Sequence, residues 1–231
     1  MESKSVALDG PSGAGKSTLA RRAAMEFGYI YIDTGALYRS IGLFALQNNV
    51  ASTDEKAVVA LLSQINLEMM YDDEGVQRMI LSGDDVTDKI RTPEASKYAS
   101  DVSAMPPVRE FLLNMQRDMA VKYDIIMDGR DIGTVVLPNA GLKVFLVADA
   151  KVRAKRRYDE LIAKGMDVDF EDVHRDMIQR DKNDSERAVA PLKAADDAVM
   201  LDTTSFDFEE SVQALCKIIS ERYGLKYAGI N

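Results

Sequence analysis

The segment Gly10-Pro-Ser-Gly-Ala-Gly-Lys-Ser17 constrains this chain more than any other feature, because it matches the phosphate-binding pattern G-x-x-x-x-G-K-[ST] at every fixed position. Its glycines allow backbone N–H groups to converge on phosphate oxygens in conformations that other residues rarely adopt. A short apolar run at 5–8 precedes the loop, and the pattern at 16–27 predicts a helix whose positive dipole end favours bound phosphate. We therefore expect the chain to bind the phosphates of a nucleoside triphosphate.

Within the loop, we expect Lys16 to reach the β- and γ-phosphates and the Ser17 hydroxyl to ligate Mg²⁺. The predicted nucleotide-binding residues are Gly10, Pro11, Ser12, Gly13, Ala14, Gly15, Lys16, Ser17 and Thr18.

The order of apolar runs and helical patterns predicts an α/β fold. We expect a three-layer P-loop fold, with a central parallel sheet of about five strands and helices on both of its faces. The expected strands lie at 5–8, 29–32, 124–127, 142–147 and 198–201. The expected helices lie at 16–27, from 33 onward, and at 151–164, 169–184 and 208–223.

The middle of the chain departs from this pattern. Runs at 67–71 and 76–81 flank Asp72-Asp-Glu-Gly75, which is typical of a β-hairpin, and further helices are expected near 93–103 and 107–123. We interpret roughly 64–105 as a small α+β insertion.

Composition narrows the function classes. The net charge of −9 argues against broad binding to nucleic acid, which needs a basic face. No apolar run approaches the roughly 20 residues that a membrane span needs, and the N-terminus does not resemble a signal peptide. A single cysteine, Cys216, excludes an internal disulfide framework. These features favour a cytoplasmic protein.

Two charged clusters outside the loop are candidates for a second substrate site. Arg39 ends the segment 33–39, which follows the second strand at the sheet edge where α/β proteins bind ligands, so it either faces a cleft or is an ordinary surface arginine. Asp128, Arg130 and Asp131 follow the third strand. Asp128 could hold Mg²⁺ directly or through water, and Arg130 could clamp a phosphate, although a simple polar turn is the alternative.

Two more groups of charges lie on predicted helices. Arg180, Asp184 and Arg187 are spaced i, i+4, i+7 and would share one helical face, which is either functional or merely solvated. Arg153 and Arg157 could belong to a mobile lid that shields the transferring phosphates, or to a solvent-facing helix paired with neighbouring carboxylates.

With these clusters placed, the chain resembles the bacterial cytidylate kinase family of nucleoside monophosphate kinases over nearly its whole length. The segments that carry the resemblance are 9–17, 33–39, 83–92, 128–136 and 187–192. The first is shared by many families, whereas the others together are far more specific. The resemblance implies a kinase of pyrimidine nucleotide metabolism that transfers the γ-phosphate of ATP to CMP or dCMP with Mg²⁺.

The same resemblance implies one domain, 1–231, with a core at 1–33, 108–150 and 167–231, a monophosphate-binding region at 34–107, and a lid at 151–166. It also implies site residues: Arg39 and Arg130 at the CMP phosphate, Thr34, Arg109, Asp131 and Arg187 around the cytosine, Ser100, Arg180 and Asp184 at the sugar, and Arg153 and Arg157 in the lid. The catalytic set would be Lys16, Asp128, Arg130, Arg153 and Arg157.

The implied cytosine contact makes chemical sense, because the exocyclic amine of cytosine is a donor that the Asp131 carboxylate can accept, whereas uracil presents a carbonyl there. Two alternatives stay open. One is a kinase for another small acceptor, such as UMP, AMP or a metabolite. The other is a nucleotide-binding switch. The chain lacks the Asn-Lys-x-Asp motif that reads guanine in GTPases, and this argues against a switch. We expect a monomer that acts on small nucleotides, with no nucleic acid or membrane partner.

Overall fold

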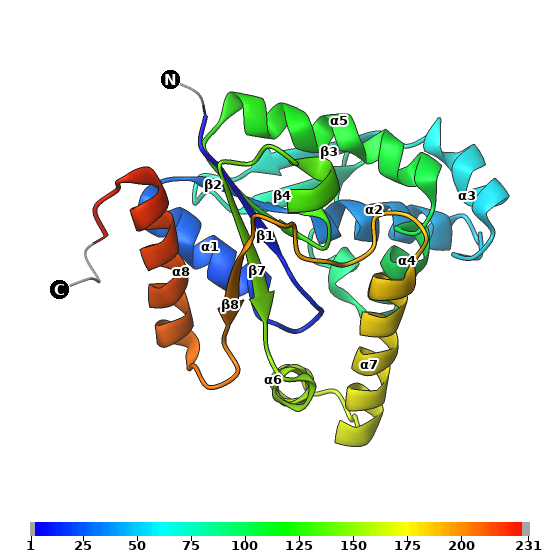
Figure 1. Cartoon of the computed structure of the whole chain (residues 1–231). Helices are drawn as coiled ribbons and strands as arrows, with labels where there is room; N and C mark the ends of the chain where they lie inside the picture. The colour runs from blue at the N-terminus through cyan, green and yellow to red at the C-terminus, as the bar shows by residue number, and fades with distance from the viewer. Residues whose placement is uncertain (1–2, 228–231) are drawn as a thin grey trace. The chain divides into compact units, whose positions relative to one another are not determined.

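The computed structural model describes residues 3–227, so residues 1–2 and 228–231 of the predicted core lie outside the described residues. The chain divides into two compact units, one made of 1–30 with 123–231 and the other of 31–122. Figure 1 shows the elements in chain order. The division into core, monophosphate-binding region and lid stays a prediction. Within residues 3–227, none of the helices combines the length and apolar character needed to cross a membrane.

The central sheet has five strands in the order β2-β6-β1-β7-β8. Their bounds are β1 Ser5–Asp9, β2 Ile30–Asp33, β6 Ile125–Gly129, β7 Leu142–Val147 and β8 Val199–Asp202. The pairs β1–β6, β1–β7 and β7–β8 are parallel. All of β6 and all but the first residue of β1 are buried, as expected for parallel strands that are covered on both faces. The predicted α/β fold with about five parallel strands is confirmed.

The helices of the first unit are α1 Lys16–Phe27, the π-helical turn η2 Ile132–Val136, α6 Ala150–Ala163, α7 Phe170–Glu186 and α8 Phe208–Tyr223. α1 packs against β6 and lies beside α8, as Figure 1 shows, while α6 contacts α7. α8 starts with a capping box, because Asp207 accepts the Glu210 N–H and the Glu210 side chain accepts the Asp207 N–H, each at 2.8 Å.

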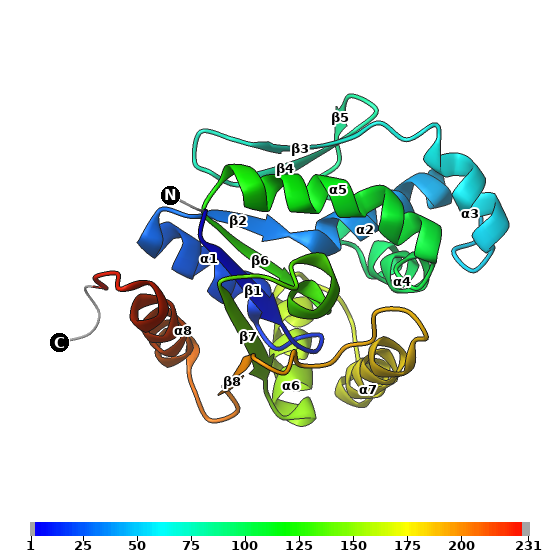
Figure 2. The ribbon, with the colours of Figure 1, turned by 45° about the horizontal axis from the view of Figure 1, so that its top comes forward.

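The second unit contains helices α2 Thr34–Gln47, α3 Glu55–Leu62, α4 Pro93–Val102 and α5 Pro106–Lys122, the 3₁₀ turn η1 Lys89–Arg91, and strands β3 Leu67–Tyr71, β4 Gln77–Leu81 and β5 Asp84–Asp85. The strands form a small antiparallel sheet in the order β3-β4-β5, which Figure 2 shows edge-on. The predicted hairpin and the two predicted helices after it are confirmed, with ends that move by one residue.

Four short elements were not predicted from the sequence: α3, β5, η1 and η2. α3 is short, and of its eight residues only Val58 is buried, so its apolar residues give no clear helical stripe. η2 has the sequence Ile-Gly-Thr-Val-Val, which favours a strand by propensity. Its first two N–H groups donate to the Asp9 carboxylate, so a side chain of β1, which is distant in the sequence, fixes this turn.

Gly42 lies where α2 packs against α4. A Cβ added at this position would meet the Tyr98 Cβ at 2.7 Å and the Ala99 nitrogen at 3.2 Å. The Gly42→Ala variant should therefore lower the free energy of unfolding by about 2 kcal/mol through overpacking, even though alanine is the better helix former. Denaturant titration followed by circular dichroism would measure this.

Ala60→Gly on the exposed part of α3 is the control, because it reports helix propensity alone and should cost about 1 kcal/mol. A Gly42→Ala protein more stable than the parent would show that α2 and α4 can separate without penalty.

Candidate active site

The phosphate-binding loop has the backbone that its glycines permit. Gly10 has φ of 151°, and a Cβ there would lie 2.2 Å from the Leu146 carbonyl oxygen. Gly15, at φ 90°, is the N-cap of α1, and no side chain caps the helix there. The N–H groups of the first helical turn are therefore directed at the loop rather than at a capping side chain, which suits an anion.

The surroundings of Lys16 shift the pKa of its amine strongly. Lys16 is buried, and its Nζ donates to the Pro11 carbonyl at 2.7 Å. Burial lowers the pKa of Lys16 well below its ordinary value, and the Arg130 charge acts in the same direction, while Asp128 and Asp184 oppose them. Additional negative charge at the loop would favour the protonated amine.

Ser17 and Asp128 meet because β1 and β6 run parallel, with Leu8 opposite Asp128. The Ser17 Oγ donates to the Asp128 Oδ2 at 2.8 Å, and Asp128 is buried. Among residues 3–227, no group of three or more His, Cys, Asp or Glu side chains could hold a metal ion. The hydroxyl and the carboxylate fit Mg²⁺ all the same, because this ion binds proteins through one or two oxygen ligands and completes its shell with waters and substrate phosphates.

Next to this pair lies an arginine–carboxylate cluster, which we define as Arg130, Asp131, Arg180, Asp184 and Arg187. The Arg130 Nε donates to the Asp184 Oδ2 at 2.8 Å. The Arg187 Nη2 donates to the Asp131 Oδ1 at 3.2 Å, and both of these side chains are at most 7% exposed. Two predicted groups, one directly after β6 and the other on α7 and its C-cap, are thus joined in the first unit.

The charges of this cluster balance one another. Burial disfavours the charged Arg130 guanidinium, but Asp184, Asp128 and Asp181 together keep the pKa of Arg130 above its ordinary value. Burial would also raise the pKa of Asp184, yet the arginines at 130, 180 and 187 hold that pKa below its ordinary range. Arg130 and Asp184 therefore stay ionised at neutral pH as a charged pair.

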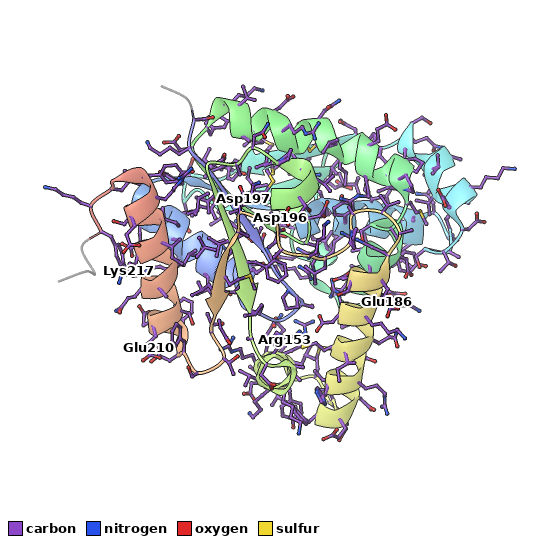
Figure 3. The ribbon with its side chains drawn as sticks, viewed as in Figure 1. Arg153, Glu186, Asp196, Asp197, Glu210 and Lys217 are labelled. Atoms are coloured by element: carbon purple, nitrogen blue, oxygen red, sulfur yellow. The ribbon has the colours of Figure 1, made fainter. Side chains whose placement is uncertain are left out.

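Arg153 lies in the first turn of α6 (Figure 3) and is buried. Its guanidinium donates to the Ala148 carbonyl at 2.9 Å and to the Ser12 carbonyl at 2.8 Å, and it pairs with Asp181 of α7 at 2.6 Å. Arg157, one turn later, is partly exposed and pairs with Glu160 at 2.8 Å. The two predicted lid arginines therefore differ, since Arg153 is attached to the phosphate-binding loop and Arg157 belongs to the helix surface.

The second unit carries its own group of predicted residues at the start of α2. Asp33 caps this helix by accepting the Ala36 N–H at 2.9 Å, and Arg39 pairs with the other Asp33 oxygen at 2.7 Å. Thr34 is buried beside this pair in the chain. Gln77 of β4 accepts the Asp33 N–H at 2.8 Å, so the hairpin fixes the first turn of α2.

Arg109 of α5 forms a further group in the same unit. It is buried, donates to the Ser103 carbonyl at 3.2 Å, and stacks its guanidinium over the Tyr38 ring at 5.8 Å from the centroid. Ser100 is connected to it through Ser103, whose hydroxyl donates to the Ser100 carbonyl at 2.9 Å. The predicted Ser100 and Arg109 thus lie within one small network.

Sequence reasoning overlooked the residues that support these predicted ones: Asp9, Asp33, Tyr38, Gln77 and Asp181. Asp33 did carry a signal, because it stands three residues before an amide that it caps. The others act across strands or between helices, and no local pattern marks them.

Comparison with known proteins gives one consistent result. The family model described as cytidylate kinase matches residues 6–221. The chain is 49% identical over 218 residues to the cytidylate kinase of Caldicellulosiruptor bescii, covering 94% of this chain and 96% of that protein. It is 48% identical to that of Lactobacillus johnsonii over 217 residues, covering 94% of each.

Among solved structures, shikimate kinase from Bacteroides thetaiotaomicron aligns over 94% of this chain and 98% of its own, with a TM-score of 0.46 and 15% identity. This likeness is too weak to support an inference about function.

The contacts of Arg153 predict a structural cost that Arg157 does not share. Arg153→Met should lower the free energy of unfolding by about 3 kcal/mol, because it leaves Asp181 and the Ser12 carbonyl without their buried donor. Arg157→Met, in the same helix, removes only a surface pair and should cost less than about 0.5 kcal/mol. Urea titration of both variants would test this, and equal losses would contradict it.

Proposed function

Because the chain belongs to the cytidylate kinase family, we propose that it transfers the γ-phosphate of ATP to CMP or dCMP, giving CDP or dCDP and ADP. The observation that carries the proposal is the position of the phosphate-binding loop beside the arginine–carboxylate cluster, linked through Lys16, Asp128 and Arg130. A kinase needs one group of donors for the triphosphate and another for the acceptor, and the first unit supplies both.

On the donor side, the loop N–H groups and the first turn of α1 bind the phosphates of ATP, and Lys16 neutralises the charge at the transferring phosphoryl group. A bound polyphosphate would offset the burial that lowers the pKa of Lys16. Ser17, with Asp128 acting directly or through water, would hold Mg²⁺. When bound, Mg²⁺ supplies charge neutralisation on the phosphate oxygens.

On the acceptor side, Arg130 holds the CMP phosphate, while Arg180 and Asp184 contact the sugar. Asp131 accepts a hydrogen bond from the exocyclic amine of cytosine, and its partner Arg187 suits the acceptor atoms of the same base. Support comes from the fixed directions of these side chains, each of which has a buried hydrogen-bond or ionic partner.

The second unit contributes further acceptor residues in this proposal: Arg39 for the phosphate, Thr34 and Arg109 for the base, and Ser100 for the sugar. In this proposal Asp33 holds Arg39 in place through their ion pair, and Gln77 in turn fixes Asp33 by accepting its N–H.

The chemistry needs no strong general base, because the CMP phosphate is already an anionic nucleophile. The enzyme then accelerates the reaction by positioning ATP and CMP and by neutralising the charge on the transferring phosphoryl group. Arg153 and Arg157 on α6 add positive charge to this task, and the hydrogen bond from Arg153 to Ser12 supports a place for it beside the triphosphate.

We also propose that the enzyme is a cytoplasmic monomer that acts on free nucleotides, without nucleic acid or membrane partners. The net charge of −9 and the single buried cysteine support this.

An acceptor panel tests the function. ADP formation with ATP and Mg²⁺ should be fast with CMP and dCMP and much slower with UMP and AMP. Equal turnover of CMP and AMP would favour a kinase for another acceptor. Slow hydrolysis that does not depend on any acceptor would instead indicate a nucleotide-binding switch.

Lys16→Ala should lower kcat by roughly 100-fold or more while the fold persists, because it removes charge stabilisation at the transferring phosphate. Lys217→Ala, on the exposed part of α8 (Figure 3), is the matched control and should leave kcat unchanged. Steady-state kinetics with circular dichroism would measure both, and near-normal turnover of Lys16→Ala would reject its role.

Asp131→Ala should reduce the preference for CMP over UMP by about tenfold or more, since a hydrogen-bonded edge discriminates strongly between bases. Asp196→Ala removes an exposed carboxylate (Figure 3) and should leave the ratio of kcat/KM values unchanged. An unchanged ratio in Asp131→Ala would remove this residue from base recognition.

A further inference from the structure

We propose that Asp9 is a positioning residue for the acceptor base, because its carboxylate fixes the turn that presents Asp131. Asp9 is the last residue of β1 and is only 4% exposed. Its Oδ1 accepts the Ile132 N–H at 2.8 Å, and its Oδ2 accepts the Gly133 N–H at 2.7 Å. One side chain thus binds two consecutive amides across the sheet.

These two amides are the ones that the start of a helix leaves unpaired. An aspartate at the N-cap normally satisfies such amides with its own carboxylate. Asp131 is the N-cap of η2 but makes no such capping bond. Because Asp9 takes over this task, the Asp131 Oδ1 can accept from Arg187 instead, at 3.2 Å. By binding the two amides, Asp9 leaves the Asp131 side chain directed toward Arg187.

The segment that carries Arg130 and Asp131 is held at both ends. At one end, Gly129 of β6 lies opposite Asp9 in the parallel ladder. At the other end, the Asp9 carboxylate holds Ile132 and Gly133. Only two residues therefore connect a fixed strand to a fixed turn, so a shift of the turn would move both side chains together.

The surroundings of Gly133 show that η2 packs in ordinary van der Waals contact with this carboxylate. A Cβ at Gly133 would lie 3.4 Å from the Asp9 Oδ2 and 3.1 Å from the Lys143 Cδ. Burial raises the pKa of Asp9 to about 6, with a further contribution from the Asp131 charge, while the Gly133 and Ile132 amides act against them. Above pH 7 the carboxylate is ionised and can accept both amides.

Asp9→Asn is the direct test, because asparagine keeps the shape but replaces one acceptor oxygen with an NH₂ group that faces an N–H donor. We expect the CMP to UMP ratio of kcat/KM to fall by roughly tenfold, as a small misplacement of a recognition group does. The KM for CMP should rise, while the KM for ATP should change less than about twofold. Asp9→Glu, which restores both oxygens, should recover part of the ratio.

Asp207→Asn is the control, since it alters another aspartate that accepts a backbone amide, at the start of α8. It should lower thermal stability and leave the base preference unchanged. An unchanged ratio in a folded Asp9→Asn protein, or equal rises of both KM values, would overturn the inference and leave Asp9 a stabiliser of the sheet. If Asp9→Asn does not fold, Asp9→Glu keeps the charge but moves both oxygens by one methylene group; it should lower the ratio by a smaller factor, and an unchanged ratio or equal rises of both KM values in this variant would overturn the inference.

The inference rests on the proposed function, and the wild-type enzyme separates the two. A wild type that uses UMP as well as CMP would contradict both. A selective wild type whose ratio survives in the Asp9→Asn and Asp9→Glu variants would contradict the role of Asp9 alone.

Discussion

The parallel pairing of β1 with β6 is the constraint on which the site depends. It places Leu8 opposite Asp128 and Asp9 opposite Gly129, so the two strands end at the same edge of the sheet. The phosphate-binding loop leaves from one strand and the charged segment 130–131 leaves from the other. A slip in this register would separate Ser17 from Asp128 and the Asp9 carboxylate from η2, and both hydrogen-bonded links would be lost together.

Charge in the site is compensated before any ligand arrives. Lys16 is buried, Arg130 and Arg180 are partly buried, and burying cations costs free energy unless carboxylates accompany them. Asp128, Asp184 and Asp181 supply that compensation. The same carboxylates fix the directions of the cations, so little reorganisation remains for the reaction itself. Opposite effects on pKa follow, with a lowered value for Lys16 and a raised one for Arg130.

The sequence predicted those parts of the molecule that local physics determines. The P-loop, the apolar strands beside it and the capped helices follow from residue spacing, and the structure confirms them within one or two residues. The resemblance supplied roles for Arg130, Asp131 and Arg187, and the structure joins these residues through Asp184 and one another.

The supporting contacts could not be predicted, because they join residues that are distant in the chain. Asp9 meets Ile132 across 123 residues, and Arg153 meets Ser12 across 141. η2 folds as a π-helical turn against its strand propensity because its amides are bound by Asp9.

The hydrogen bond from Arg153 to Ser12 has a mechanical consequence. The guanidinium connects the phosphate-binding loop to α6 and, through Asp181, to α7. If α6 moves away from the loop, either the loop moves with it or the Ser12 carbonyl and the Asp181 carboxylate lose the donor that they share, the Arg153 guanidinium. Displacement of α6 and the conformation of the phosphate-binding loop are therefore coupled, so a change in one is expected to change the other.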